Sequence, residues 1–122
     1  NSGAKIAIGS DWPIEDMNPF LAIEVAATRQ DPNTDSGLAL NENERISLES
    51  VLEAYTRNVA YAMKLENQTG SIETGKLADL IVLDRNLFDI PVYQISDTKV
   101  LLTMFGGKKI YSVDNLTKDS KD

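Results

Sequence analysis

Residues 5–8 form a short apolar run, bounded by Gly9, that fits a buried β-strand better than a helix. Two helical segments follow this run before the next strand pattern appears. A strand cannot satisfy its own backbone N–H and C=O groups, so it must pair with a neighbour. The fold therefore requires either that a later strand returns to pair with residues 5–8, or that the partner strands lie elsewhere in a longer protein.

The first helix is predicted over residues 19–30. Asn18 is a favourable N-cap, and Pro19 takes the first helical position, where its missing N–H costs nothing. Apolar residues recur at helical spacing and predict one buried face: Phe20, Ile23, Ala26 and Ala27. The stretch that follows, residues 31–43, is rich in Asp, Asn, Pro, Ser and Gly, which indicates a loop.

A second, longer helix is predicted over residues 47–65, with Ser47 as its N-cap. Its apolar positions mark one face: Leu48, Val51, Leu52, Tyr55, Val59, Ala62 and Met63. Asn58 lies on this helix, where its side-chain amide can bond a neighbouring loop. We expect the helix to pack across the later strands, because those strands contain its best apolar partners.

Strands are predicted near the C-terminal end. Leu80–Leu83 is an unbroken apolar run flanked by Asp79 and Asp84, the pattern of a strand covered on both faces. The two aspartates stand at opposite ends of the run, so we expect them to be structural. Gly106 and Gly107 supply the positive φ angles of a tight turn and predict a β-hairpin over residues 99–112.

The composition excludes several classes of partner. Twelve basic and nineteen acidic residues give a net charge of −7, which repels nucleic acid and anionic lipid surfaces. No apolar run approaches the roughly twenty residues that span a bilayer. The absence of cysteine excludes disulfides, thiolate zinc sites and cysteine nucleophiles. We therefore expect no nucleic acid and no membrane as partners; the compartment stays open, with the cytoplasm slightly favoured.

Five stretches together resemble a known family. They are GSDWP at residues 9–13, NPF with ATR within residues 18–29, ERISLESVLEAYTRNVAYAM at residues 44–63, GSIETGKLADLIVLD at residues 70–84 and DTKVLLTMFGGKKIY at residues 97–111. In this order they resemble the C-terminal end of the amidohydrolase superfamily, in particular amidohydrolase family 3 and its N-substituted formamide deformylases. The resemblance covers nearly the whole chain.

The resemblance implies an architecture larger than this chain. As an isolated fragment the chain would be α+β, whereas the family fold is a (β/α) barrel with catalytic groups at the C-terminal ends of its strands, plus a small β-sandwich built from both ends of the polypeptide. Residues 1–66 would then be the last barrel strand and its helices, and residues 67–113 the C-terminal share of the sandwich. Residues 114–122 would be a polar, frayed tail.

The resemblance also assigns a role to Asp11. From the residues alone, Asp11 fits an Asx turn or a cap at a strand end as well as a functional group. By resemblance it matches the aspartate that contacts the metal centre and takes a proton from the metal-bound water. A divalent ion lowers the pKa of its water to about 7, and a nearby carboxylate can pass the released proton to a leaving amine. Trp12 could line the substrate pocket, with simple packing as the alternative.

The chain departs from the family in its metal ligands. Family sites use a His-x-His pair, further histidines and often a carboxylated lysine or glutamate, but this chain contains no histidine. A catalytic zinc ion takes three protein ligands, so one carboxylate cannot hold it. We therefore expect a divalent metal, with zinc as the first candidate, in the full-length protein, and none in this fragment, which should be inactive alone.

The functional expectation is hydrolysis of C–N bonds in a small-molecule non-peptide or cyclic amide, with the remainder of the barrel as the partner of this segment. The alternative is a non-catalytic binding or regulatory module that associates through an exposed strand edge, for example as a homodimer.

Overall fold

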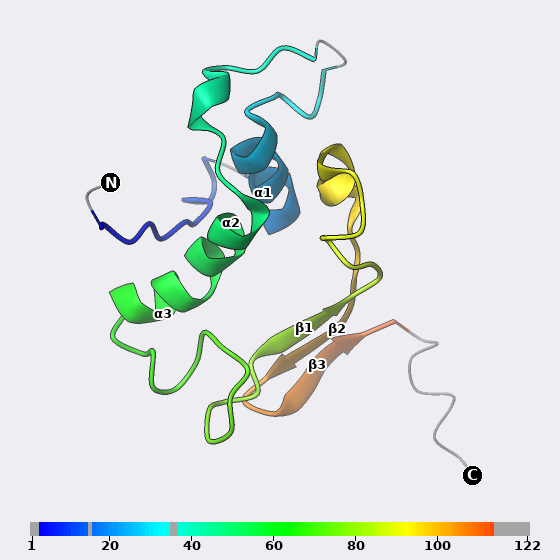
Figure 1. Ribbon diagram of the computed structural model, residues 1–122. Coiled ribbons are helices and arrows are strands. Elements are labelled where there is room, and N and C mark those ends of the chain that lie inside the picture. Colours follow the sequence, from blue (N-terminus) through cyan, green and yellow to red (C-terminus); the bar gives the residue numbers. More distant parts are fainter. Residues whose placement is uncertain (1–2, 15, 35–36, 114–122) are drawn as a thin grey trace.

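The computed structural model describes residues 3–14, 16–34 and 37–113; the predicted tail at residues 114–122 lies outside these ranges. Within them, helices are stacked beside a three-stranded antiparallel sheet. Figure 1 shows the helices at one end of the molecule and the sheet at the other, with the N-terminal segment beside the helices. The expected α+β character of the chain is confirmed.

Helix α1 spans Pro19–Thr28. The predicted cap is confirmed, because the Asn18 side chain accepts a hydrogen bond of 3.1 Å from the backbone N–H of Phe20. The helix ends two residues before the predicted boundary. Arg29 adopts a left-handed conformation with φ 59°, and its N–H bonds the Val25 carbonyl at 2.7 Å, which closes the last turn.

The predicted long helix is two helices, α2 at Leu48–Tyr55 and α3 at Arg57–Ala62. The break is at Thr56, whose φ of −121° and ψ of −87° are not helical. Its hydroxyl donates to the Leu52 carbonyl at 2.6 Å, a contact that often bends helices. A continuous helix over residues 47–65 was therefore a wrong prediction, because the apolar periodicity runs across the break without marking it.

The sheet consists of β1 at Leu80–Leu83, β2 at Val100–Phe105 and β3 at Lys108–Ser112, in the order β1-β2-β3. The hairpin prediction is confirmed, with Gly106 at φ 54° and Gly107 at φ 76° in the turn between β2 and β3. The prediction that β1 is covered on both faces is wrong for the described chain. Ile81 and Val82 are 47% and 39% exposed, because no described element covers that part of the strand.

The strand predicted over residues 5–8 is absent from the described chain. The three described strands pair with one another, and none of them pairs with residues 5–8. The segment lies against the helices instead. The Ile8 N–H donates to the carbonyl of Ala54 in α2 at 3.2 Å, and the Ile8 side chain packs against the core.

The core lies between α1, α2 and the 3₁₀ helix η2 at Val92–Asp97. Its buried members come from all three elements and from the loop after β1: Phe20, Ile23, Val51, Leu87 and Ile95. A carboxylate joins two of these elements, because the buried Glu24 side chain accepts a hydrogen bond of 2.7 Å from the backbone N–H of Ser96. Helix α1 is thus fastened to η2 by both apolar and polar contacts.

The expected packing of the long helix across the strands is only partly observed. Leu83 and Val100, at one end of the β1–β2 pair, join the core cluster that contains Val51. Farther along the strands, a cavity of about 520 Å³ lies between α2, α3 and the sheet. The helices and the sheet therefore meet at one end and diverge at the other, as Figure 1 shows.

Candidate functional site

Asp11 lies in a turn at the end of the N-terminal segment. Its φ is 50°, a left-handed value that aspartate tolerates better than most residues. The Asp11 carbonyl accepts a hydrogen bond of 3.0 Å from the N–H of Ile14, which closes the turn, and the Trp12–Pro13 peptide bond within it is cis. Asp11 and Trp12 are both exposed, Trp12 to 64%. The two predicted site residues therefore stand together in one exposed turn.

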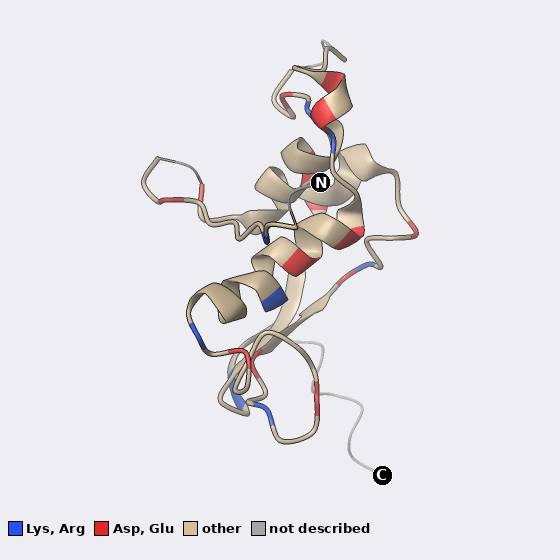
Figure 2. Cartoon of the chain, turned by 60° about the vertical axis from the view of Figure 1, so that its left-hand side comes forward, with Lys and Arg blue, Asp and Glu red and all other residues tan. Residues whose placement is uncertain are grey.

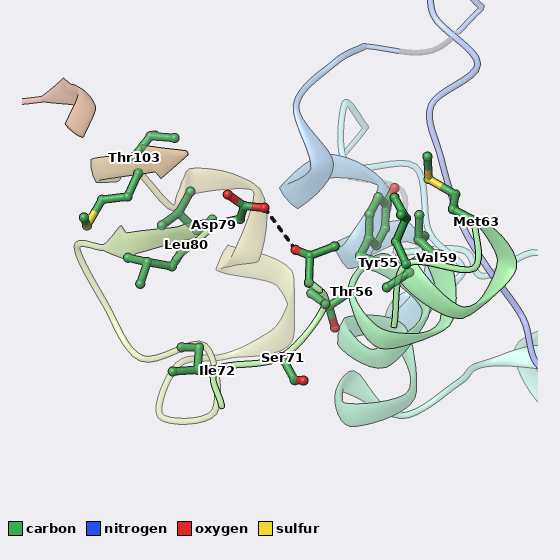
Figure 3. A pocket seen from close by; sticks show the side chains of 15 residues that line it. Tyr55, Thr56, Val59, Met63, Ser71, Ile72, Asp79, Leu80 and Thr103 are labelled. Atoms are coloured by element: carbon green, nitrogen blue, oxygen red, sulfur yellow. Dashed lines mark hydrogen bonds between the residues drawn. The ribbon is translucent and has the colours of Figure 1, made fainter. Parts of the chain in front are cut away.

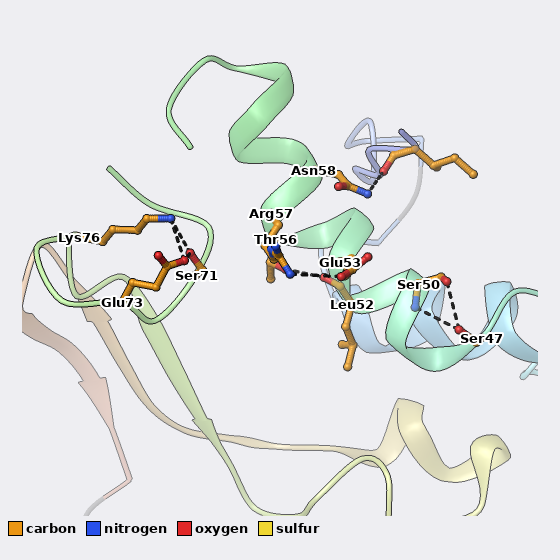
Figure 4. A network of polar contacts seen from close by, with 11 residues as sticks. Ser47, Ser50, Leu52, Glu53, Thr56, Arg57, Asn58, Ser71, Glu73 and Lys76 are labelled. Atoms are coloured by element: carbon orange, nitrogen blue, oxygen red, sulfur yellow. Dashed lines mark hydrogen bonds and ion pairs between the residues drawn. The ribbon is translucent and has the colours of Figure 1, made fainter. Parts of the chain in front are cut away.

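Three contacts hold the segment that precedes this turn. The Asn58 side-chain amide donates to the Ile6 carbonyl at 2.9 Å, and Figure 4 shows this amide reaching the N-terminal segment from α3. The Ile8 N–H donates to Ala54, as described above. The Lys5 ammonium lies 3.9 Å from the centroid of the Tyr61 ring, within the range of a cation–π contact. The expected contact of Asn58 with a neighbouring segment is thus observed.

The orientation of α3 depends on two features beyond its own sequence. The break at Thr56 gives α3 a direction different from that of α2. The loop that follows α3 returns close to it at Gly70, where an added Cβ would lie 2.5 Å from the Ala60 Cβ. Gly70 has a φ of 90°, which a side chain rarely allows. The position of α3, and with it that of the Asn58 side chain, is therefore set by the break at Thr56 before the helix and by the loop at Gly70 after it.

The described residues do not form a metal site by themselves. In residues 3–14, 16–34 and 37–113, no three histidine, cysteine, aspartate or glutamate side chains gather closely enough to hold an ion. A zinc site takes at least three protein ligands. Asp11 can offer one oxygen donor, so any complete set of ligands would need residues from other parts of the protein.

The cavity between the helices and the sheet is mainly apolar. Figure 3 shows Tyr55, Val59 and Met63 on its helical side and Leu80 on the side of the sheet. Asp79 stands at its edge, where its two carboxylate oxygens accept hydrogen bonds from Gly106 N–H at 2.7 Å and from the Thr69 hydroxyl at 3.1 Å. These bonds tie the hairpin turn to the loop after α3, in keeping with the structural role expected for Asp79. Asp11 and Trp12 do not line this cavity.

Two carboxyl groups outside the Asp11 turn, those of Glu73 and Asp84, have lowered pKa values. The pKa of Glu73 is lowered because Ser71 donates a hydrogen bond to its carboxylate and Lys76 both donates a bond and places a positive charge nearby. The pKa of Asp84 is lowered because the Arg85 guanidinium and the Lys99 backbone N–H donate to it. Glu73 and Asp84 are exposed and their partners Lys76 and Arg85 are partly buried, so both pairs are local features near the surface.

The charges of the described chain are scattered along it. Figure 2 shows lysine and arginine on several different elements and acidic residues among them. Within the described ranges, every helix is too short or too polar to cross a bilayer.

The sequence matches a known protein family over most of its length. The profile described as the amidohydrolase family matches residues 1–111, which is nearly the whole chain. The chain belongs to the amidohydrolase family. The match includes the Asp11 turn, α2 and α3, and the sheet as far as Tyr111, so the elements that hold the candidate site all lie within the family region.

Two curated relatives illustrate the similarity. Protein LONG AFTER FAR-RED 3 of Arabidopsis thaliana is 40% identical over 111 residues, which are 91% of this chain and 18% of the relative. The N-substituted formamide deformylase of Arthrobacter pascens is 32% identical over 107 residues, 88% of this chain and 19% of the relative. This chain therefore spans about a fifth of the length of the curated relatives it matches.

A solved structure shows the same fold. The amidohydrolase from Thermotoga maritima MSB8 superposes with a TM-score of 0.68 over 91% of this chain and 24% of the other chain, at 24% sequence identity. The arrangement of helices and sheet described above thus also occurs as a segment of a larger amidohydrolase.

The sequence predicts Asp11 and Trp12 as site residues and a structural contact from Asn58, but it does not indicate the other residues that hold the N-terminal segment. The backbone of Ala54 and the ring of Tyr61 also contact the N-terminal segment. Neither carries a sequence signal for this role, because one acts through a main-chain carbonyl and the other is an ordinary position on a helix surface.

Proposed function

We propose that this chain is the C-terminal part of a hydrolase that cleaves C–N bonds in small non-peptide amides, cyclic amides included, and that Asp11 is its contribution to the catalytic centre. The observation that carries the proposal is the amidohydrolase family match over residues 1–111, which includes the Asp11 turn. The similarity to a relative named N-substituted formamide deformylase supports the bond type.

In this proposal Asp11 acts as the proton acceptor. Its side chain is exposed, and the turn that carries it follows a segment that three contacts hold in place. A carboxylate so placed can accept the proton of an attacking water and deliver it to the leaving nitrogen, a contribution typically worth about 10²–10⁴-fold in rate. A divalent metal ion, zinc by first preference, would lower the pKa of water in such a centre. Its ligand set would be completed by residues outside this chain, which is about a fifth as long as its relatives.

The same proposal accounts for the exposed apolar positions and for an N-terminal segment that pairs with none of the described strands. Residues 5–8 would be the last strand of a (β/α) barrel, and residues 1–66 would complete that barrel with α1, α2 and α3. Residues 67–113 would supply their share of a β-sandwich, in which the exposed Ile81 and Val82 would be covered. The likeness to a segment of the Thermotoga maritima amidohydrolase supports this placement.

Trp12 is proposed to line the substrate pocket. It is the immediate neighbour of Asp11, and its 64% exposure leaves the indole ring available for contact with a ligand. An exposed aromatic ring beside a proton acceptor can bind the apolar part of an amide substrate.

The test is the Asp11→Asn substitution in the full-length protein, assayed with an N-substituted formamide and with a cyclic amide. We expect turnover to fall by about 10²-fold or more, with the unfolding midpoint unchanged. Asp16→Asn is the matched control, since Asp16 lies in the same exposed region and an asparagine there still accepts the Asn18 N–H bond. Near-normal turnover of Asp11→Asn, or a wild-type protein that hydrolyses neither substrate, would contradict the proposal.

A further inference from the structure

The position of the Asp11 turn depends on helices α2 and α3. In the described chain no strand pairs with the preceding segment, and its attachments to the helices include the Asn58–Ile6 bond, the Ile8–Ala54 bond and the Lys5–Tyr61 contact. The first two of these are hydrogen bonds to the backbone of the segment, two residues apart. Two fixed points of this kind set both the position and the direction of a short chain.

The Asn58 bond differs from the other two contacts in what it fixes. It joins residues that are 52 positions apart in the sequence, and it uses a side chain rather than a helix carbonyl. The Ile8–Ala54 bond joins two backbone groups, so it does not depend on the identity of either side chain. The Lys5–Tyr61 contact involves an exposed lysine, and exposed cation–π contacts contribute little. Asn58 is therefore the side chain that selects which carbonyl of the segment faces α3.

The short distance along the chain between Ile6 and Asp11 links the Asn58 bond to the position of Asp11. The Ile6 carbonyl lies five residues before Asp11. Residues 6–8 are attached at both Ile6 and Ile8, so a slip of this segment along the helices moves the start of the Asp11 turn with it. Misplacing a catalytic group by about 1 Å can cost about 10²-fold in rate.

We propose that Asn58 is a positioning residue: its amide fixes the register of residues 6–8 against α3 and thereby sets where Asp11 stands in the catalytic centre. This inference rests on the proposed function of Asp11. It assigns to α3 a role in catalysis that involves no contact with the substrate.

The test uses the full-length protein and the isosteric variant Asn58→Asp. A carboxylate keeps the shape of the side chain but cannot donate to the Ile6 carbonyl. We expect kcat to fall about tenfold or more, with a smaller change in KM, and amide hydrogen exchange to accelerate in the peptide that covers residues 6–11. Asn58→Gln restores an N–H donor and should recover part of kcat. Asn67→Asp, the same charge change at an exposed asparagine beyond α3, should alter neither readout.

A double-mutant cycle separates positioning from general stability. In the Asp11→Asn background, adding Asn58→Asp should cause no further loss of turnover, because Asn58 acts through Asp11. Unchanged kcat and unchanged exchange in Asn58→Asp, or a further loss in the double variant equal to that in the single one, would overturn the inference.

The same data distinguish this inference from the proposed function. If Asp11→Asn lowers turnover but Asn58→Asp does not, the positioning role alone fails. If Asp11→Asn keeps its turnover, the proposed function of Asp11 and the positioning role of Asn58 both fail. The exchange data then report only on how residues 6–8 are attached to the helices.

Discussion

Replacing Gly70 by alanine tests how closely the loop after α3 approaches that helix. The added Cβ would lie 2.5 Å from the Ala60 Cβ and 3.2 Å from the Thr56 carbonyl oxygen. Both contacts involve the backbone or the first side-chain atom, so neither can rotate away. The φ of 90° at Gly70 adds a conformational cost that is independent of the neighbours.

The two costs can be separated with Gly75. Gly75 has a φ of 93°, but an added Cβ there meets nothing within 4 Å. Gly75→Ala should therefore report the left-handed conformation alone, about 1–2 kcal/mol. Gly70→Ala should cost the same amount plus the overlap with Ala60 and Thr56, which we place at about 1–3 kcal/mol by analogy with overpacked cores. The total is about 2–5 kcal/mol.

The assay is urea-induced unfolding followed by far-UV circular dichroism, with both variants compared with the wild-type protein under the same conditions. We expect the free energy of unfolding to decrease more in Gly70→Ala than in Gly75→Ala. Equal losses in the two variants would show that the loop does not approach α3 as described, and the account of how α3 is oriented would then be wrong.

Two further predictions concern carboxylates. Glu24→Ala leaves the partly buried Ser96 N–H without its partner and should lower the free energy of unfolding by about 1–3 kcal/mol. Glu24→Gln keeps an acceptor and should lose less in the same urea titration; equal losses would show that the bond contributes nothing. The lowered pKa of Asp84 means that its bonds from Arg85 and Lys99 stabilise the fold above the pH at which an unpaired aspartate titrates. This contribution should disappear as the pH falls through the lower, folded-state pKa. In Asp84→Asn the free energy of unfolding should therefore decline less steeply on acidification than in the wild-type protein, and an unchanged pH profile would contradict the prediction.

Features that depend on a few adjacent residues were predictable from the sequence. The caps at Asn18 and Ser47 and the Gly106–Gly107 turn are confirmed, because in each case a side chain or a glycine determines the local backbone directly. Strand β1 was also located correctly from its apolar run.

Features that depend on distant neighbours were not predictable in the same way. The break at Thr56 falls within continuous apolar periodicity, and the burial of β1 depends on which elements cover it. The apolar pattern of residues 5–8 indicates a strand, but a strand forms only where a partner strand is present, and the described chain provides none.

The candidate site also combines a residue that a local motif indicates with contacts that depend on distant neighbours. Asp11 could be named from the sequence because it belongs to the GSDWP motif, whose resemblance to the family identifies the position. The attachment of its segment to Ala54 and Asn58 joins residues far apart in the chain. Such contacts follow from the break at Thr56 and the close approach of Gly70, neither of which a local pattern reveals.

The most direct measurement is a crystal structure of the full-length protein with a bound, slowly hydrolysed N-substituted formamide analogue. The account predicts that an Asp11 carboxylate oxygen lies within about 2.6–3.2 Å of the attacking water or of the amide nitrogen, with the Asn58 amide still bonded to the Ile6 carbonyl. An Asp11 side chain turned away from the analogue, with another residue in its place, would contradict it.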